Sequence, residues 1–251
     1  MVSEVAAEAA NQHSVSTANL DARVALHGFG TSPVSWAEFV RERLPLNAGS
    51  RVLDAGAGTG VHWRLQTSAA PVLMDLHAPM CERLATFGHP VIQGSVQVLP
   101  LGDGVMDGVL CAHVLYHLDD PQGALDELLR VLRPEGWIAL ASNGRGHMLE
   151  LRELAAHAGL PRSAGAHDRF TIEDAMTGLR ERGMQPSRHD FDDDLHVTDA
   201  EAVVSYLQSL PGHLADEPRE RIRESLAARI AADGHFVVRK ETALVLAYRP
   251  A

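Results

Sequence analysis

Between residues 51 and 141, short apolar runs alternate with segments whose apolar residues recur every three or four positions. Short apolar runs are typical of strands buried on both faces, and the longer spacing is typical of helices packed on them. The pattern predicts strands at 51–55, 71–75, 90–93, 106–112 and 136–141, and helices at 61–67, 79–87 and 121–133. Such alternation predicts an α/β fold with a mostly parallel sheet and helices on both faces.

Local signals fix two helix starts in this half of the chain. Ser35-x-x-Glu38 has the form of a capping box and precedes apolar residues at helical spacing, among them Trp36. Asp120-Pro121 combines a capping acid with a proline suited to the first turn. We therefore expect one amphipathic helix before the first strand and another that begins at Pro121.

After residue 142 the pattern becomes mainly helical. We expect helices at 146–158, 171–182, 198–210 and 217–232, the second and third opened by capping boxes at Thr171-x-x-Asp174 and Thr198-x-x-Glu201. A strand is expected at 185–191 and a long final strand at 236–248, with a bend near Glu241. The acidic run from Asp190 to Asp194 is interpreted as a solvated loop.

Composition narrows the class of protein. The 251 residues are 45% hydrophobic, with a mean hydropathy of −0.08, a net charge of −11 and a pI near 5.6. An acidic chain is a poor unaided ligand for nucleic acid or an anionic membrane. The sequence has no apolar run of membrane-spanning length and no secretion signal, and Cys81 and Cys111 are expected to be buried free thiols. These features favour a cytoplasmic globular protein.

The most informative motif follows the first predicted strand. Asp54 ends that strand, and Gly56, Gly58 and Gly60 then alternate in a G-x-G-x-G pattern. Glycine permits positive φ and lets a ligand lie against bare backbone. The spacing differs from the G-x-G-x-x-G of dinucleotide folds, and an acid suits an ammonium group better than a pyrophosphate. The motif therefore favours S-adenosylmethionine, which combines a cationic amino-acid end with an adenosine.

A second acid supports this reading. Asp75 ends the next predicted strand about 20 residues beyond the turn, where an acid commonly meets a ribose. Leu76, beside it, is expected to form an apolar wall for the adenosine. The alternative is that Asp75 only organises the turn before the helix near Pro79.

With these motifs the sequence resembles the class I S-adenosylmethionine-dependent methyltransferases, in the small-molecule group called methyltransferase type 11. The resemblance runs from about 51 to 141. It is carried by Val52 to Gly60, Asp75, Gly94 to Leu101, Met106 to Val109, Leu115 to Leu118 and Leu128 to Gly136.

This resemblance implies a Rossmann-like sheet with an antiparallel last strand, extra C-terminal helices and a small-molecule acceptor. It also assigns a cofactor role to each matching position. The methionine end would be lined by Asp54, Gly56 and Gly58. The adenosine would be lined by Asp75, Leu76, Ser95 and Val96, and the backbone of Ala112 would lie near the sulfonium. Ser95 departs from the family, which usually has an aspartate there, so the adenine contact would lack charge assistance.

Four side chains are candidates for proton removal from the acceptor. His113, Tyr116 and His117 directly follow the fourth predicted strand, and His147 follows the fifth. Strand ends of parallel sheets meet at one edge, and histidine can act as a base at neutral pH. Packing roles are the alternative for each of them. A metal site of His113, His117 and His147 is a weaker alternative, because no carboxylate or cysteine pair completes a familiar ligand set.

The predicted function is methyl transfer to oxygen or nitrogen of a small metabolite. The alternative is an enzyme, such as a cyclase, that keeps the cofactor without methylating, whereas an NAD-dependent oxidoreductase is disfavoured by the glycine spacing. We expect one domain over residues 1–251. Its parts would be an N-terminal helical cap or lid (1–50, in which the segment His27 to Trp36 would fold over the cofactor), a cofactor-binding core (51–141), a helical substrate-pocket region (142–235) and a final strand (236–251).

Overall fold

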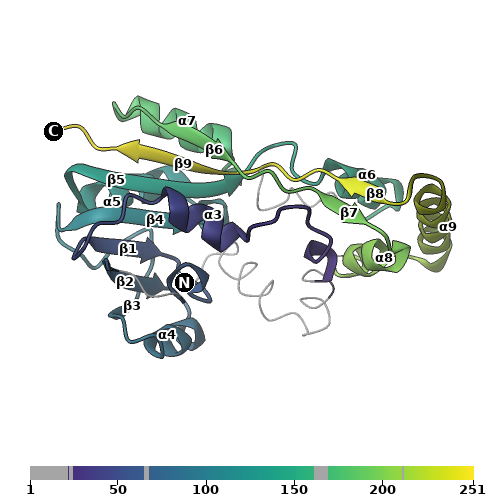
Figure 1. The fold of residues 1–251 in the computed structure, drawn as a ribbon, viewed down its shortest axis with the longest axis horizontal. Coiled ribbons are helices and arrows are strands. Elements are labelled where there is room, and N and C mark those ends of the chain that lie inside the picture. The colour runs from purple at the N-terminus through teal and green to yellow at the C-terminus, as the bar shows by residue number, and fades with distance from the viewer. Residues whose placement is uncertain (1–21, 23–24, 65–67, 161–168, 211) are drawn as a thin grey trace. The chain divides into compact units, whose positions relative to one another are not determined.

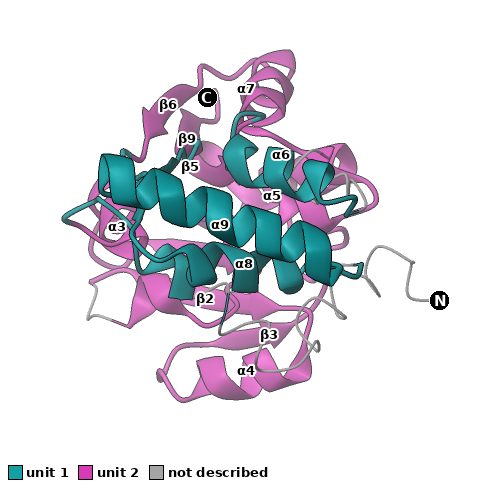
Figure 2. Cartoon of the chain, turned by 90° about the vertical axis from the view of Figure 1, so that its right-hand side faces the viewer, with its two compact units in different colours: residues 1–33, 145–166, 192–241 teal, residues 34–144, 167–191, 242–251 magenta. Residues whose placement is uncertain are grey.

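The computed structural model describes residues 22, 25–64, 68–160, 169–210 and 212–251 (Figure 1). The chain divides into two compact units (Figure 2). Unit 1 comprises residues 1–33, 145–166 and 192–241, and unit 2 comprises residues 34–144, 167–191 and 242–251. Each unit is therefore assembled from three separate stretches of chain, and the expectation of a single domain stays a prediction.

Unit 2 contains a seven-stranded, mostly parallel sheet in the order β3-β2-β1-β4-β5-β9-β6. Strands β1 to β5 pair in parallel, and β9 runs antiparallel to both β5 and β6. This topology confirms the predicted Rossmann-like sheet with an antiparallel last strand. The strands are β1 (Arg51–Ala55), β2 (Ala70–Asp75), β3 (Val91–Gln93), β4 (Met106–Ala112), β5 (Leu132–Asn143), β6 (Ser187–Asp190) and β9 (Thr242–Tyr248).

Helices cover both faces of this sheet. On one face, Phe39 of α3 and Leu84 of α4 join Val52, Leu110 and Ala139 of the strands in one hydrophobic cluster. Helices α5 and α7 pack against β5, and Figure 1 shows α3 in front of the sheet and α5 behind it. The unit 2 helices are α3 (Trp36–Arg43), α4 (Ala78–Ala85), α5 (Pro121–Val131) and α7 (Ile172–Glu181), with 3-10 turns η1 (Val61–Trp63) and η2 (Leu115–His117).

Three of the predicted helix caps are present. Ser35 and Glu38 form the expected capping box at α3, and Thr171 and Asp174 form the one at α7. Asp120 accepts from the Gly123 N–H at 2.8 Å and starts α5. Each cap satisfies an amide that the first helical turn leaves without an intrahelical partner.

Among its described residues, unit 1 packs helices α6, α8 and α9 and a two-stranded antiparallel sheet, β7-β8, around its own apolar core. Leu26, Leu151, Val204 and Phe236 are representative core residues, each at most 3% exposed. The elements are α6 (Leu149–His157), β7 (Leu195–Val197), α8 (Ala200–Gln208), α9 (Asp216–Asp233) and β8 (Phe236–Val238). None of the helices in the described ranges combines the length and apolar character needed to span a bilayer.

Four details of the predicted pattern are corrected. The strand expected at 236–248 divides at 239–241 into β8 and β9, which belong to different sheets. Helix α8 is capped by Asp199, not Thr198, because the Asp199 carboxylate accepts from the Glu201 N–H at 2.9 Å. The short strand β7 was not predicted. In the expected helix at 61–67, η1 covers only Val61–Trp63, and residues 65–67 lie outside the described ones.

The acidic run at 190–194 is not simply a solvated loop. Asp193 is only 7% exposed and forms an ion pair with Lys240 within unit 1. Its other carboxylate oxygen accepts from the N–H groups of Thr31 and Ser32 at 2.8 and 3.0 Å. Thr31 and Ser32, part of the segment His27 to Trp36 that was predicted to be a lid, are thus bound within unit 1. Residues 1–21 of the expected cap lie outside the described ones.

Candidate functional site

The glycine loop after β1 is a tight turn that rests on β2. Gly56, Gly58 and Gly60 all have positive φ, at 84°, 53° and 68°. A Cβ on Gly56 would lie 2.4 Å from Val114 Cγ2, and one on Gly60 would lie 2.2 Å from the Phe87 ring. A Cβ on Gly58 would meet nothing within 4 Å. Packing therefore requires the outer two glycines, whereas Gly58 leaves bare backbone that a ligand can approach.

Asp54 lies beneath this loop and is only 1% exposed. Its Oδ2 accepts a hydrogen bond from Trp63 Nε1 at 2.7 Å, while Oδ1 has no hydrogen-bond partner among the described residues. Burial raises the pKa of this carboxyl to about 7, although the Trp63 hydrogen bond opposes the rise. A buried acidic oxygen without a donor fits a cationic group supplied by a ligand.

Asp75 fastens the turn that follows β2. Its Oδ2 accepts from the Gly58 N–H and its Oδ1 from the His77 N–H, both at 2.9 Å. The turn-organising role considered from sequence is therefore present. Each carboxylate oxygen can accept a second hydrogen bond, so the ribose role stays a prediction. Leu76 is 49% exposed beside it, which leaves an apolar surface for an adenosine.

The remaining cofactor candidates lie on the loop after β3 and at the end of β4. Ser95 Oγ accepts from the Gln97 N–H at 3.2 Å, and Val96 is buried at 6% exposure. Ala112 is half-buried at the last position of β4. The Ser95 hydroxyl thus supports its own loop, and its adenine contact stays a prediction.

Aromatic rings gather beyond the end of β4. His113 takes a left-handed conformation, φ 58°, and its N–H donates to Ala141 O at 2.9 Å. Its ring centroid lies 6.1 Å from that of Tyr116, which in turn lies 4.5 Å from that of His117. The structure therefore brings three of the four predicted catalytic residues together. Burial raises the pKa of the Tyr116 hydroxyl, so this group stays protonated at neutral pH.

Two further residues extend this cluster, and the sequence analysis did not assign them to the site. Trp36, from α3, has its ring centroid 5.4 Å from that of His113 and 5.3 Å from that of Phe191. Trp36 Nε1 is buried and has no hydrogen-bond partner among the described residues. From sequence, Trp36 was predicted to lie on an amphipathic helix and at the end of the lid segment His27 to Trp36. Its lone indole N–H instead offers a donor to a ligand.

His147, the fourth catalytic candidate, belongs to unit 1. It is 9% exposed, and its Nδ1 accepts from the Glu241 N–H at 3.2 Å. This bond requires an unprotonated Nδ1, so a neutral His147 carries its proton on Nε2. Among the described residues, no three histidine, cysteine, aspartate or glutamate side chains are placed to hold a metal ion.

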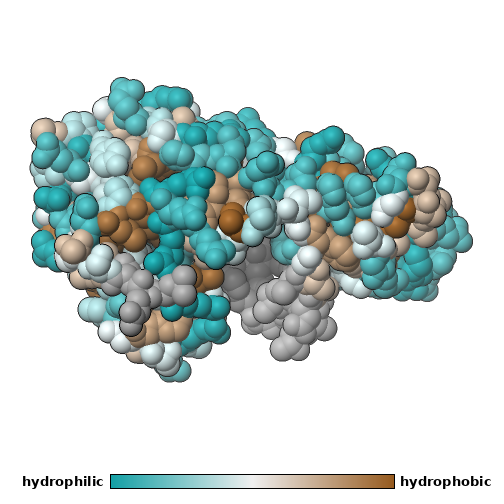
Figure 3. Space-filling model, viewed as in Figure 1, coloured by the Kyte–Doolittle hydropathy of each residue, from teal (hydrophilic) through white to brown (hydrophobic). Residues whose placement is uncertain are grey.

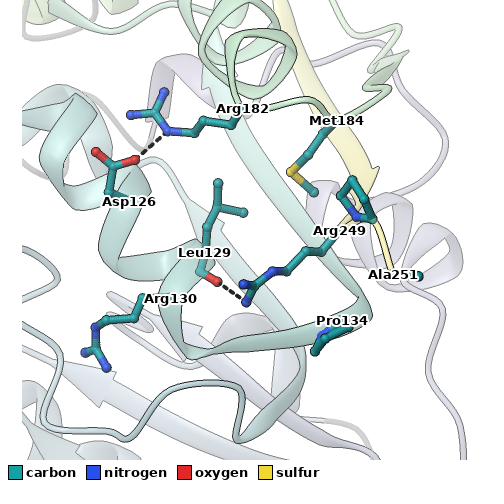
Figure 4. A pocket seen from close by; sticks show the side chains of 9 residues that line it. Asp126, Leu129, Arg130, Pro134, Arg182, Met184, Arg249 and Ala251 are labelled. Atoms are coloured by element: carbon teal, nitrogen blue, oxygen red, sulfur yellow. Dashed lines mark hydrogen bonds and ion pairs between the residues drawn. The ribbon is translucent and has the colours of Figure 1, made fainter.

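A cavity of about 440 Å³ lies elsewhere in unit 2, between the ends of α5, α7 and β9 (Figure 4). Its arginines are already engaged, since Arg182 pairs with Asp126 at 2.6 Å and Arg249 donates to Leu129 O at 3.0 Å. Pro134, at its wall, is near the start of β5, whereas the glycine loop follows the end of the parallel strand β1. The cavity is therefore at the opposite end of the sheet from the cofactor candidates.

Comparison with known proteins gives a consistent picture. A family model described as a methyltransferase domain matches residues 53–140. An uncharacterized methyltransferase of Mycobacterium tuberculosis is 32% identical in an alignment of 200 positions that covers 73% of this chain and 76% of the relative. A malonyl-[acyl-carrier protein] O-methyltransferase of Enterobacter lignolyticus is 30% identical over 57% of this chain and 59% of its own length. A demethylmenaquinone methyltransferase of Corynebacterium urealyticum is 33% identical over 42% and 47%.

Solved structures agree on the fold. The YcgJ protein of Bacillus subtilis has a TM-score of 0.59 at 18% identity, covering 86% of this chain and 98% of that protein. The [4+2]-cyclase SpnF has a TM-score of 0.55 at 18% identity, covering 87% and 84%. One sheet topology thus occurs in proteins named for different chemistry, so the site must decide function.

Proposed function

Because the chain belongs to the class I S-adenosylmethionine-dependent methyltransferases, we propose that it methylates an oxygen or nitrogen of a small planar acceptor. The observation that carries this proposal is the aromatic cluster beyond β4, formed by Trp36, His113, Tyr116 and His117. Flat rings favour a flat acceptor, and the cluster also contains groups that can donate or accept a proton.

The residues of the glycine loop fit the cofactor. The lone Oδ1 of Asp54 suits the methionyl ammonium, and the uncovered backbone at Gly58 leaves room beside it. Asp75 would accept from the ribose hydroxyls, with Leu76 against the adenosine. When bound, S-adenosylmethionine supplies a methyl group on a cationic sulfur. Ala112 ends β4, the strand beside β1 in the sheet, and the aromatic cluster follows it directly in the sequence. This position is consistent with methyl transfer at the end of β4.

The cluster would hold the acceptor and take its proton. Trp36 would donate its indole N–H to an oxygen or ring nitrogen of the acceptor, and Tyr116 would wall the ring. His117 is the first choice for general base, with His113 and His147 as further candidates. One relative is named as an O-methyltransferase and another as a demethylmenaquinone methyltransferase. An oxygen acceptor and a quinone acceptor are both compatible with the proposed cluster.

The test is a screen of phenols, hydroxyquinones, carboxylates and amines with methyl-labelled S-adenosylmethionine. We expect label on oxygen or nitrogen of a planar acceptor, with one S-adenosylhomocysteine released per methyl transferred. Trp36→Phe should raise KM for that acceptor while leaving S-adenosylhomocysteine affinity unchanged. Label found only on carbon, or an acceptor converted without S-adenosylhomocysteine release, would refute the proposal. The second result would favour the cofactor-retaining cyclase.

A further inference from the structure

Trp63 and Asp54 form a buried side-chain pair within unit 2. Trp63 is 2% exposed and Asp54 is 1% exposed, and the indole N–H donates to Oδ2 at 2.7 Å. The 3-10 turn η1, which follows the glycine loop, places Trp63 nine positions after the acid. The glycine loop and the 3-10 turn that follows it are thus continuous in the chain, and the turn supplies the hydrogen-bond donor for Asp54.

The surroundings of Asp54 make this donor important. Among the described residues, the titratable groups that face it are Asp75, from β2, and the thiol of Cys111, from β4. Neither brings positive charge, and the burial of Asp54 disfavours its ionised form. An indole N–H only donates, so it stabilises the carboxylate without neutralising it. Trp63 therefore keeps one oxygen occupied and leaves Oδ1 to a ligand.

We propose that Trp63 is a positioning residue for cofactor binding, which orients Asp54 and favours its ionised form so that Oδ1 receives the methionyl ammonium. This inference rests on the cofactor placement in the proposed function. With its pKa raised to about 7 by burial, part of the Asp54 population would carry a proton in the ligand-free protein near neutral pH. Binding of the ammonium would then expel that proton to solvent, because the ion pair needs the carboxylate. Cofactor uptake would be coupled to proton release.

The experiment is calorimetric titration of the full chain with S-adenosylhomocysteine, which keeps the ammonium and reacts no further. Titrations run from about pH 6 to about pH 8.5, a range around the Asp54 pKa, in two buffers of different ionisation enthalpy. The difference between buffers counts the protons released. The variants are Trp63→Phe, Asp54→Asn and, as the matched control, Trp137→Phe. Trp137 is also buried, belongs to the same hydrophobic cluster and lies against Gly108.

Trp63→Phe should move proton release to higher pH and weaken binding about tenfold at the acidic end, with a smaller loss at the basic end. Asp54→Asn should weaken binding and abolish proton release, whereas Trp137→Phe should keep the wild-type profile. Thermal unfolding of each variant reports whether it folds.

Three outcomes overturn the inference. A Trp63→Phe protein with an unchanged pH profile, or with the same loss at every pH, leaves Trp63 a packing residue only. Wild-type protein that binds without exchanging protons across the range excludes the coupling, even if no variant folds. Asp54→Asn with wild-type affinity removes the acid from the cofactor site, which is a failure of the proposed placement itself.

Discussion

The backbone N–H of Gly58 donates to Asp75 Oδ2 at 2.9 Å, so the glycine loop after β1 is fastened to the end of β2. Asp75→Ala removes this anchor and the acceptor for the His77 N–H. We expect S-adenosylhomocysteine binding to weaken by roughly 1.5–3 kcal/mol, the cost of losing hydrogen bonds to a charged group. Calorimetry measures this change in affinity, and the control is Asp119→Ala, a substitution at an exposed position. Equal affinity in both variants would remove Asp75 from the cofactor site.

Gly58→Ala separates backbone strain from ligand exclusion. Gly88 is its matched control, because both glycines have positive φ and open space where a Cβ would stand. Alanine at either position should cost about 1–2 kcal/mol of folding stability, the penalty for a left-handed alanine. Only Gly58→Ala should also lose S-adenosylhomocysteine binding, since its methyl would occupy the ligand side of the loop. Similar binding by the two variants would contradict a cofactor at Gly58.

His117→Ala tests the general base. For a hydroxyl acceptor, turnover should fall by roughly 10²–10⁴-fold, the contribution typical of a positioned base. Affinity for S-adenosylhomocysteine should stay close to that of the wild type, and the histidine limb of the pH–rate profile should disappear. The exposed His157 on α6, changed to alanine, is the control. Unaltered turnover and pH dependence on a hydroxyl acceptor would exclude His117 as the base.

Lys240→Met should destabilise the protein by about 3–5 kcal/mol at neutral pH, because it leaves the buried Asp193 carboxylate without its counter-charge. Burial opposes ionisation of Asp193, yet Lys240 and the N–H groups of Ser32 and Thr31 outweigh it and hold the pKa below its usual range. The pairing energy is therefore present above the unfolded pKa of about 3.9 and is lost as pH falls through the lower folded value.

Chemical denaturation at several pH values checks this prediction. The gap between wild type and Lys240→Met should close as pH drops below about 4, where the unfolded carboxyl protonates. Adding Asp193→Asn to Lys240→Met should recover part of the loss, because no buried charge remains. A double variant as unstable as the single one would show that Lys240 contributes by packing alone.

The strands of the cofactor half were predictable because their signals are local. An apolar run that ends in an acid and glycines predicts β1 directly, and β4 has the predicted bounds at Met106–Ala112. Side-chain caps such as Ser35 act within one helical turn, so the sequence contains the whole interaction. The resemblance to the family added the antiparallel direction of the last strand, which local patterns do not specify.

The features that the sequence did not predict depend on residues far apart along the chain. The burial of Asp193 requires Lys240, which lies 47 positions later. Strand β7, only three residues long, exists because it pairs with β8, some 40 residues away. The proposed site role of Trp36 rests on its ring contacts with His113 and Phe191, which lie far from it in the sequence. The hydrophobic periodicity of such short segments is too weak to predict contacts between residues so far apart in the chain.

The position of β9 has a consequence for how the chain folds during synthesis. Strand β6 is joined to the sheet through β9 alone, in the order β5-β9-β6. Until the ribosome has released residues 242–248, β5 is an uncovered edge and β6 has no strand to pair with, a state prone to association with other chains. The sheet can therefore close only after residues 242–248 have emerged, well after β6 itself. Truncations that remove β9 should accumulate as aggregates, since they expose that edge permanently.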